Sequence, residues 1–275
     1  MAGAAGTAHQ RRVGDTLGRF ILIILIVAIT AGHLSDFPII CTISAALLLS
    51  YACYFRRGSL LLCGILFLLL SIDDIGRWIP VFSEVPVIWK LTVIVFSFLA
   101  VSPFRGCRSW STWFKYGKIE GFTIAAVAGV SLVSAVALIA WAGWSDNLGI
   151  AVKMAQGVRH YPKPLTFMVL IPCFAALNAL MEEIVFRGVL QTALSEFFHN
   201  PYLIIAMQAS AFAAFHFAMG FPNGWTGYGM TLLYGSALGY LKQWTDGLFA
   251  PWLCHLMADL TIFYYVVNLT LQHAA

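Results

Sequence analysis

Charged residues are scarce in this chain. Asp, Glu, Lys and Arg make up 10% of its 275 residues, whereas hydrophobic residues make up 60%. Soluble globular domains contain about 25% charged residues, so the composition argues against a soluble protein. A membrane-spanning helix needs about 20 largely apolar residues, which leaves room for about eight or nine spans and no separate soluble domain. We therefore predict an all-α, polytopic integral membrane protein built as a helical bundle.

The sequence is equally poor in cysteine pairs and repeats. Its six cysteines lie mostly inside apolar runs and show no CxxC spacing, so we expect small buried hydrophobic residues. No internal repeat and no low-complexity tract is present.

The basic residues lie near the N-terminus and between apolar runs. They account for most of the net charge of +4 and comprise Arg11, Arg12, Arg19, Arg56, Arg57, Arg105, Arg108, Lys115 and Lys118. Cytoplasmic loops of membrane proteins are rich in Lys and Arg, so this bias predicts a multi-pass protein of the plasma (inner) membrane with a cytoplasmic N-terminus. It does not indicate nucleic-acid binding. Residues 20–31 lack a small-residue cleavage site, which predicts a retained helix instead of a signal peptide.

The apolar runs predict the order of helices and loops. We expect a polar tail at residues 1–18, followed by N-terminal transmembrane helices at 19–164 and a C-terminal part at 165–275. Spans are predicted at residues 20–31, 39–55, 60–72, 87–101, 119–141, 166–198, 202–219, 230–241 and 248–269. Pro, Gly, Asn or polar residues predict loops or turns at 80–86, 144–164, 199–201, 221–228 and 242–247.

Some positions within these segments carry a more specific expectation. Trp78 and Trp89 are expected near the lipid headgroups. Pro172 is expected to interrupt the helix at 166–198 mildly. Gly235 and Gly239 have the four-residue spacing that allows two helices to approach closely.

Three charged residues stand in the apolar run that begins at Thr166: Glu182, Glu183 and Arg187. Each charge costs about 2.5 to 3.5 kcal/mol at the centre of a membrane helix, so the three are expected to face a protein interior or a wet cavity. Glu183 and Arg187 are four residues apart and can pair on one helix face, whereas Glu182 lies about 100° around the helix. Glu182 is therefore the candidate general base. The alternative is a buried ion pair that only locks two helices together.

Two histidines and an aspartate follow on the next helices. Glu183 lies 17 residues before Asn200 and His216 lies 16 residues after it. Two antiparallel helices joined at Asn200 would bring these residues to the same height, because both rise by about 1.5 Å per residue. His255 and Asp259 are four apart on one helix face. A single intramembrane histidine is usually a hydrogen-bonded packing residue, but the convergence of these groups on three C-terminal helices favours a catalytic site.

Three short motifs resemble those of a known family. EEIVFR at residues 182–187, FAAFH at 212–216 and HLMAD at 255–259 are similar to EExxxR, FxxxH and HxxxN/D of the CPBP (Abi) family. That family groups type II CAAX prenyl endopeptidases with bacteriocin-processing and bacteriocin-immunity proteins. The resemblance covers about residues 165–269 and implies an α-helical intramembrane endopeptidase whose catalytic domain is the part at 165–275.

The resemblance also implies a role for each site residue. Glu182 and His216 would activate a water molecule, and His255 and Asp259 would stabilise the oxyanion, while Glu183 and Arg187 would form a structural ion pair. Asp259 stands where CAAX-processing enzymes often have Asn, so we expect it to hold His255 as a cation. No cofactor is expected. The expected partners are the lipid bilayer and a peptide or lipidated protein substrate that is CAAX-like or bacteriocin-like.

The same residues allow other interpretations. Glu182, His216, His255 and Asp259 include ligand types that zinc accepts, so a zinc-dependent protease ranks second, although a closely spaced His pair is missing. The sequence lacks HExxH, a GxSG serine turn and GxGD, which argues against other intramembrane proteases. A non-enzymatic alternative is an ion- or proton-coupled transporter, an immunity protein or a scaffold. A degenerate family member that binds without cutting is a further possibility.

Overall fold

The computed structural model describes residues 15–30, 38–55, 57–71, 86–102, 114–145, 161–219 and 221–273. Within these ranges every regular element is helical, which confirms the all-α prediction. Gly121–Trp144 and Lys163–Ser195 are long and apolar enough to cross a membrane. Shorter apolar helices are Ile39–Phe55, Gly58–Leu70, Leu91–Val101 and Pro201–Phe217. The predicted number of spans remains a prediction.

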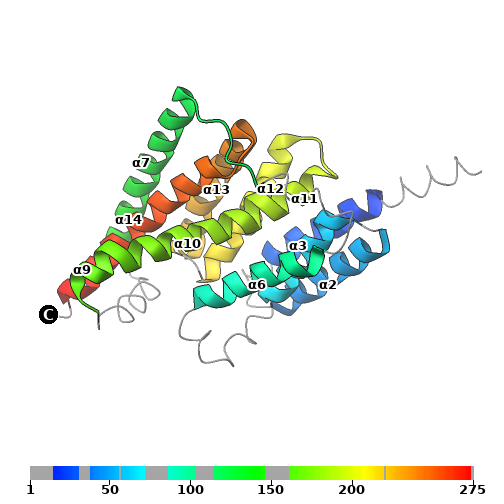
Figure 1. The fold of residues 1–275 in the computed structure, drawn as a ribbon, viewed down its shortest axis with the longest axis horizontal. Helices are drawn as coiled ribbons and strands as arrows, with labels where there is room; N and C mark the ends of the chain where they lie inside the picture. Colours follow the sequence, from blue (N-terminus) through cyan, green and yellow to red (C-terminus); the bar gives the residue numbers. More distant parts are fainter. Residues whose placement is uncertain are drawn as a thin grey trace, which may run out of the picture.

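The N-terminal helices form one group at the side of the molecule (Figure 1). They are a helix over residues 15–30, α2 (Pro38–Phe55), α3 (Gly58–Ser71) and α6 (Pro86–Val101). Their buried Leu, Ile and Ala side chains form a continuous core with the helix that carries Arg187. Gly64 permits the close approach of α2 and α3, because a Cβ there would lie 3.0 Å from the backbone of Leu49.

The central element is one long helix that runs past both halves of the molecule (Figure 1). It consists in order of α9 (Lys163–Leu165), η2 (Thr166–Leu170), α10 (Ile171–Glu183), η3 (Ile184–Leu190) and α11 (Gln191–Ser195), where η marks π-helical turns. Pro172 does not break the helix. The mild interruption expected there takes the form of the π-helical stretch η2, which precedes it. The wider turn accommodates a residue that lacks a backbone N–H. A second π-helical stretch, η3, begins immediately after Glu183.

The C-terminal helices are α12 (Pro201–Met219), α13 (Gly224–Thr245) and α14 (Phe249–His273). Asn200 caps α12 as its Oδ1 accepts hydrogen bonds from the backbone N–H groups of Tyr202 and Leu203 at 3.0 and 3.4 Å. The predicted turn is present, but it spans residues 196–200, because α11 ends at Ser195 and Pro201 already begins α12. Gly235 and Gly239 lie where α13 packs closely on α12, since a Cβ on Gly235 would lie 3.0 Å from the Phe212 ring.

Helix α7 (Gly121–Trp144) lies along α14 on the side away from the N-terminal group (Figure 1). It exposes Leu132, Val136 and Ile139, an outer face suited to lipid. Before α7, residues 114–120 form no regular secondary structure and hydrogen-bond to the turn that joins α13 to α14. There the Lys118 N–H donates to Thr245 O at 2.8 Å, and the Leu248 N–H donates to Lys115 O at 2.9 Å.

Two predicted loops are shorter than expected. Residues 224–228 were predicted to be loop and residues 242–245 turn, but both stretches belong to α13. The first error arose from the glycines: Gly227 is needed inside the helix, because a Cβ there would meet the backbone of Pro222 at 2.5 Å. The second error arose because α13 continues up to Asp246. The left-handed conformation of this residue (φ 54°) ends the helix.

Several predictions lie outside the described residues. They concern the polar tail up to residue 14, the loop at 80–86 with Trp78, most of the connection at 144–164, and Arg11, Arg12, Arg56, Arg105 and Arg108. The predicted position of the Trp89 side chain also stays a prediction.

Candidate active site

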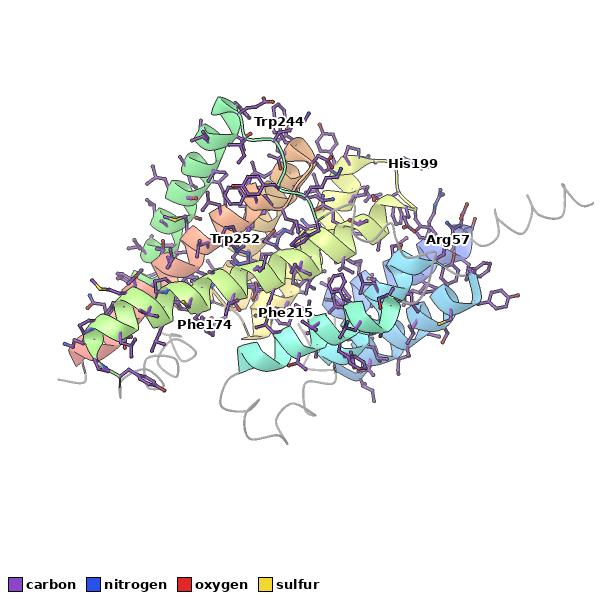
Figure 2. The ribbon with its side chains drawn as sticks, viewed as in Figure 1. Arg57, Phe174, His199, Phe215, Trp244 and Trp252 are labelled. Atoms are coloured by element: carbon purple, nitrogen blue, oxygen red, sulfur yellow. The ribbon has the colours of Figure 1, made fainter. Side chains whose placement is uncertain are left out.

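The six residues singled out by the sequence meet where three helices come together. Glu182 and Glu183 end α10 and Arg187 follows in η3, while His216 stands on α12, and His255 and Asp259 stand on α14. All except the half-buried His216 are buried. Trp252 helps to hold α14 against α10, because its Nε1–H donates to Ala176 O at 3.1 Å (Figure 2). The predicted gathering of these residues is thus present in the structure.

Glu183 and Arg187 form a fully buried ion pair. Arg187 Nη1 lies 2.8 Å from Glu183 Oε1, and both side chains are 0% exposed. The Arg187 guanidinium also donates to Gly235 O at 3.3 Å and lies 4.3 Å from the centre of the Phe212 ring. These contacts link α10, α12 and α13, so the pair has the hydrogen bonds and the aromatic neighbour that a buried charge requires.

Glu183 has a second partner that the sequence did not reveal. The same oxygen, Oε1, lies 2.7 Å from His255 Nδ1, at hydrogen-bond distance. A carboxylate only accepts, so Nδ1 carries the proton and donates it. The expected partner of this imidazole, Asp259, lies farther away, with 3.8 Å between its Oδ1 and His255 Nε2. Glu183 is therefore the residue that orients the His255 ring.

Glu182 faces both imidazoles. Its Oε2 lies 3.8 Å from His216 Nε2 and 3.6 Å from His255 Nε2. The other nitrogen of His216, Nδ1, lies 3.1 Å from Phe212 O and must donate to it, because a carbonyl oxygen only accepts. In the neutral ring the Nε2 atom of His216 is thus an acceptor that is directed at Glu182.

Asn178 is a site residue that the sequence reading missed. Its Nδ2 lies 3.2 Å from Glu182 Oε1 and 3.0 Å from Asp259 Oδ2, so one amide contacts both carboxylates. A signal for it was present, since Asn178 is a polar residue one helical turn before Glu182 in an otherwise apolar stretch.

A cavity of about 390 Å³ lies beside these residues. His216, His255 and Asp259 contribute to its wall, and the remaining lining is mainly apolar. Its walls come from α7, α12, α13 and α14 and include Val133, Leu138, Phe212, Met230, Leu233 and Ile262. Tyr234 also lines the cavity, and its hydroxyl has no hydrogen-bond partner among the described residues. A molecule in this cavity would meet the histidines directly.

A protein zinc site binds the ion through at least three side chains. In the part of the chain that the structure describes, no group of three or more His, Cys, Asp and Glu side chains is placed to hold a metal. The four residues named as possible zinc ligands therefore lie together without forming a recognisable ligand set.

Residues 164–261 match a family model described as type II CAAX prenyl endopeptidase, Rce1-like. No curated protein and no solved structure matches the chain significantly. Residues 164–261 are therefore similar to this family of CAAX-type intramembrane proteases, in agreement with the three motifs. Together with the apolar helices, it indicates that the chain is an integral membrane protein.

Proposed function

We propose that this protein is an intramembrane endopeptidase that hydrolyses a peptide bond of a membrane-associated substrate, with a water molecule activated by Glu182 and His216. The observation that carries the proposal is the convergence of Glu182 Oε2 with the Nε2 atoms of His216 and His255, at 3.8 and 3.6 Å, next to an apolar cavity.

The convergence suits the binding and activation of water. Glu182 Oε2 and His216 Nε2 both accept hydrogen bonds, and their separation of 3.8 Å is too long for a direct bond. A water molecule between them would satisfy both acceptors, and polar groups at such distances are commonly bridged in this way. Glu182 would then take a proton as the water oxygen attacks the substrate carbonyl.

His255 is suited to stabilise the negative charge that develops on the carbonyl oxygen. Its Nδ1 is held by Glu183 at 2.7 Å, which leaves Nε2 directed toward Glu182 and Asp259. When the ring is protonated, the Nε2–H can donate to the oxyanion. An ionised carboxylate has no proton to donate, so Asp259 would not bind the oxyanion itself. It would act through its negative charge and through its hydrogen bond with Asn178.

The lining of the cavity favours an apolar or lipid-modified segment as the substrate. Most of its wall is hydrocarbon, with polar groups concentrated at the two histidines and Asp259. A CAAX-like lipidated tail or a bacteriocin-like leader peptide fits this description. We also propose a multi-pass bundle of about eight or nine spans with a cytoplasmic N-terminus in the plasma (inner) membrane, supported by the apolar runs and the basic residues between them.

A comparison of membrane proteomes tests this function. Cells that express the wild-type chain are compared with cells that express equal amounts of Glu182→Ala. We expect peptides with new termini, cut in membrane-associated proteins, in the wild-type cells only. Identical peptide sets at equal expression would contradict a protease and favour a transporter, an immunity protein or a scaffold.

A further inference from the structure

We propose that Asn178 is a positioning residue of this site, which holds the carboxylates of Glu182 and Asp259 through its amide group. The proposal rests on the proposed function, because the peptidase reaction gives those carboxylates their roles. Asn178 lies on α10 one turn before Glu182, and Asp259 reaches it from α14. One nitrogen thus joins two helices at the site.

The amide has the donors that this position requires. The NH₂ group of Asn has two hydrogens, and Nδ2 lies 3.2 Å from Glu182 Oε1 and 3.0 Å from Asp259 Oδ2. Each hydrogen can therefore serve one carboxylate. Two carboxylates brought this close repel each other when both are ionised, and a shared donor reduces that repulsion.

The same contacts determine which oxygen of each carboxylate faces the histidines. Asn178 engages Oε1 of Glu182, and the opposite oxygen, Oε2, lies near His216 and His255. It engages Oδ2 of Asp259, and the opposite oxygen, Oδ1, lies 3.8 Å from His255 Nε2. Asn178 therefore orients both side chains for the reaction without touching the water or the substrate.

Other residue types would not serve this purpose. A Lys at this position would pair with Glu182 and weaken it as a base, whereas an Asp would add a third carboxylate. A Leu or an Ala would leave both carboxylates without this donor. Residue 259 is a carboxylate in this chain and accepts hydrogen bonds, and α10 supplies one donor to it at residue 178.

Steady-state kinetics in proteoliposomes test the role, with a peptide that the wild type cleaves. For Asn178→Ala we expect kcat to fall about 10- to 100-fold, as for other residues that orient reacting groups, with KM close to wild type. Asn178→Leu removes the donor but keeps much of the side-chain volume, so it provides the same comparison if the Ala variant folds poorly. A wild-type kcat, or a raised KM alone, would overturn the proposal.

Two controls separate positioning from folding and from the function itself. Asn200→Ala makes the same substitution at an exposed helix cap, so it should lower the melting temperature and leave kcat unchanged. Glu182→Gln tests the base. An inactive Glu182→Gln beside a fully active Asn178→Ala overturns this inference alone, whereas an active Glu182→Gln overturns the proposed function.

A double-variant cycle provides the sharpest test. Asp259→Asn removes one of the two charges that the Asn178 amide holds together. In that background, Asn178→Ala should therefore lower kcat by a smaller factor. We expect the fold-loss in kcat to shrink by about threefold or more, since residues in direct contact are coupled. Equal fold-losses in both backgrounds would show that Asn178 does not act through Asp259.

Discussion

The imidazole of His255 donates from Nδ1 to Glu183 Oε1 at 2.7 Å, across 72 residues of sequence. The same carboxylate oxygen accepts from Arg187 at 2.8 Å. Glu183 therefore connects the buried guanidinium to a candidate catalytic ring. The ion pair predicted as structural also sets the orientation of an imidazole in the site.

Removal of the Arg187 side chain is expected to destabilise the fold, and not to act on the catalytic reaction directly. Arg187→Ala leaves the fully buried Glu183 without its cation, a loss that typically costs about 3–5 kcal/mol. Denaturant or thermal unfolding in detergent measures it. Arg57→Ala is the matched control, because its pair with Asp15 is partly exposed and is expected to contribute at most about 1 kcal/mol. A stably folded but inactive Arg187→Ala would contradict the structural role.

Chelator treatment separates glutamate chemistry from metal chemistry. If Glu182 and His216 activate the water, activity should survive a strong chelator, and the purified protein should hold no stoichiometric zinc. If the water is bound to a metal, activity should vanish with the chelator and return with added zinc. Glu182, His216, His255 and Asp259 would then be ligands.

The turn between α13 and α14 packs tightly against residues 114–120, the segment before α7. This contact should leave no space for a side chain at Gly247. A Cβ there would overlap the backbone of Gly117, which is itself in a positive-φ conformation (φ 91°). Gly247→Ala is therefore expected to lower the unfolding free energy by about 1–3 kcal/mol, as overpacking does. Gly143→Ala is the control, since nothing lies within 4 Å of its Cβ position. Equal melting temperatures for the two variants would refute the close contact.

The turn between α13 and α14 should show a small acid-sensitive contribution to stability. The hydrogen bond from Lys115 lowers the pKa of Asp246 below its ordinary value of 3.8. A carboxyl group whose pKa is lowered by folding stabilises the protein above its ordinary pKa, and the contribution is lost as the pH falls through the lowered value. Both side chains are largely exposed, so the effect at pH 7 is at most about 1 kcal/mol and decreases with salt.

Asp246→Asn tests that contribution without disturbing the backbone, because Asn also accepts the left-handed conformation found at this residue (φ 54°). The melting temperature of the variant should lie slightly below that of the wild type at pH 7. The difference should narrow as the pH falls below 3.8 and through the lowered pKa of Asp246, where the wild type loses its charge as well. A difference that stays constant with pH would rule out the ion pair as its cause.

Helix geometry alone was sufficient to predict several contacts of the site. Glu183 and His216 lie at nearly equal distances from Asn200, which predicted that α10 and α12 bring their polar groups to one height. In the structure, Glu182 Oε2 lies 3.8 Å from His216 Nε2. The four-residue spacing of Glu183 and Arg187 predicted their pair. Both predictions depend only on helix geometry, which does not require knowledge of the other helices.

Contacts between distant helices were harder to predict. The rotation of α14 about its axis decides whether His255 faces Glu183 on α10, and sequence spacing does not give that rotation. Asn178 was missed for a related reason. Its role depends on a hydrogen bond to Asp259 on another helix, which the sequence alone does not show. The start of α13 was misplaced because glycine signals both a loop and a close helix contact.

The most direct test of the whole account is the turnover of Glu182→Gln in proteoliposomes. The substitution keeps the size of the side chain and removes its negative charge and its ability to accept a proton. We expect kcat to fall about 10²- to 10⁴-fold, as for the loss of a general base, while expression and melting temperature stay near wild type. Turnover close to wild type in a well-folded Glu182→Gln protein would show that Glu182 is not the base and would contradict the proposed mechanism.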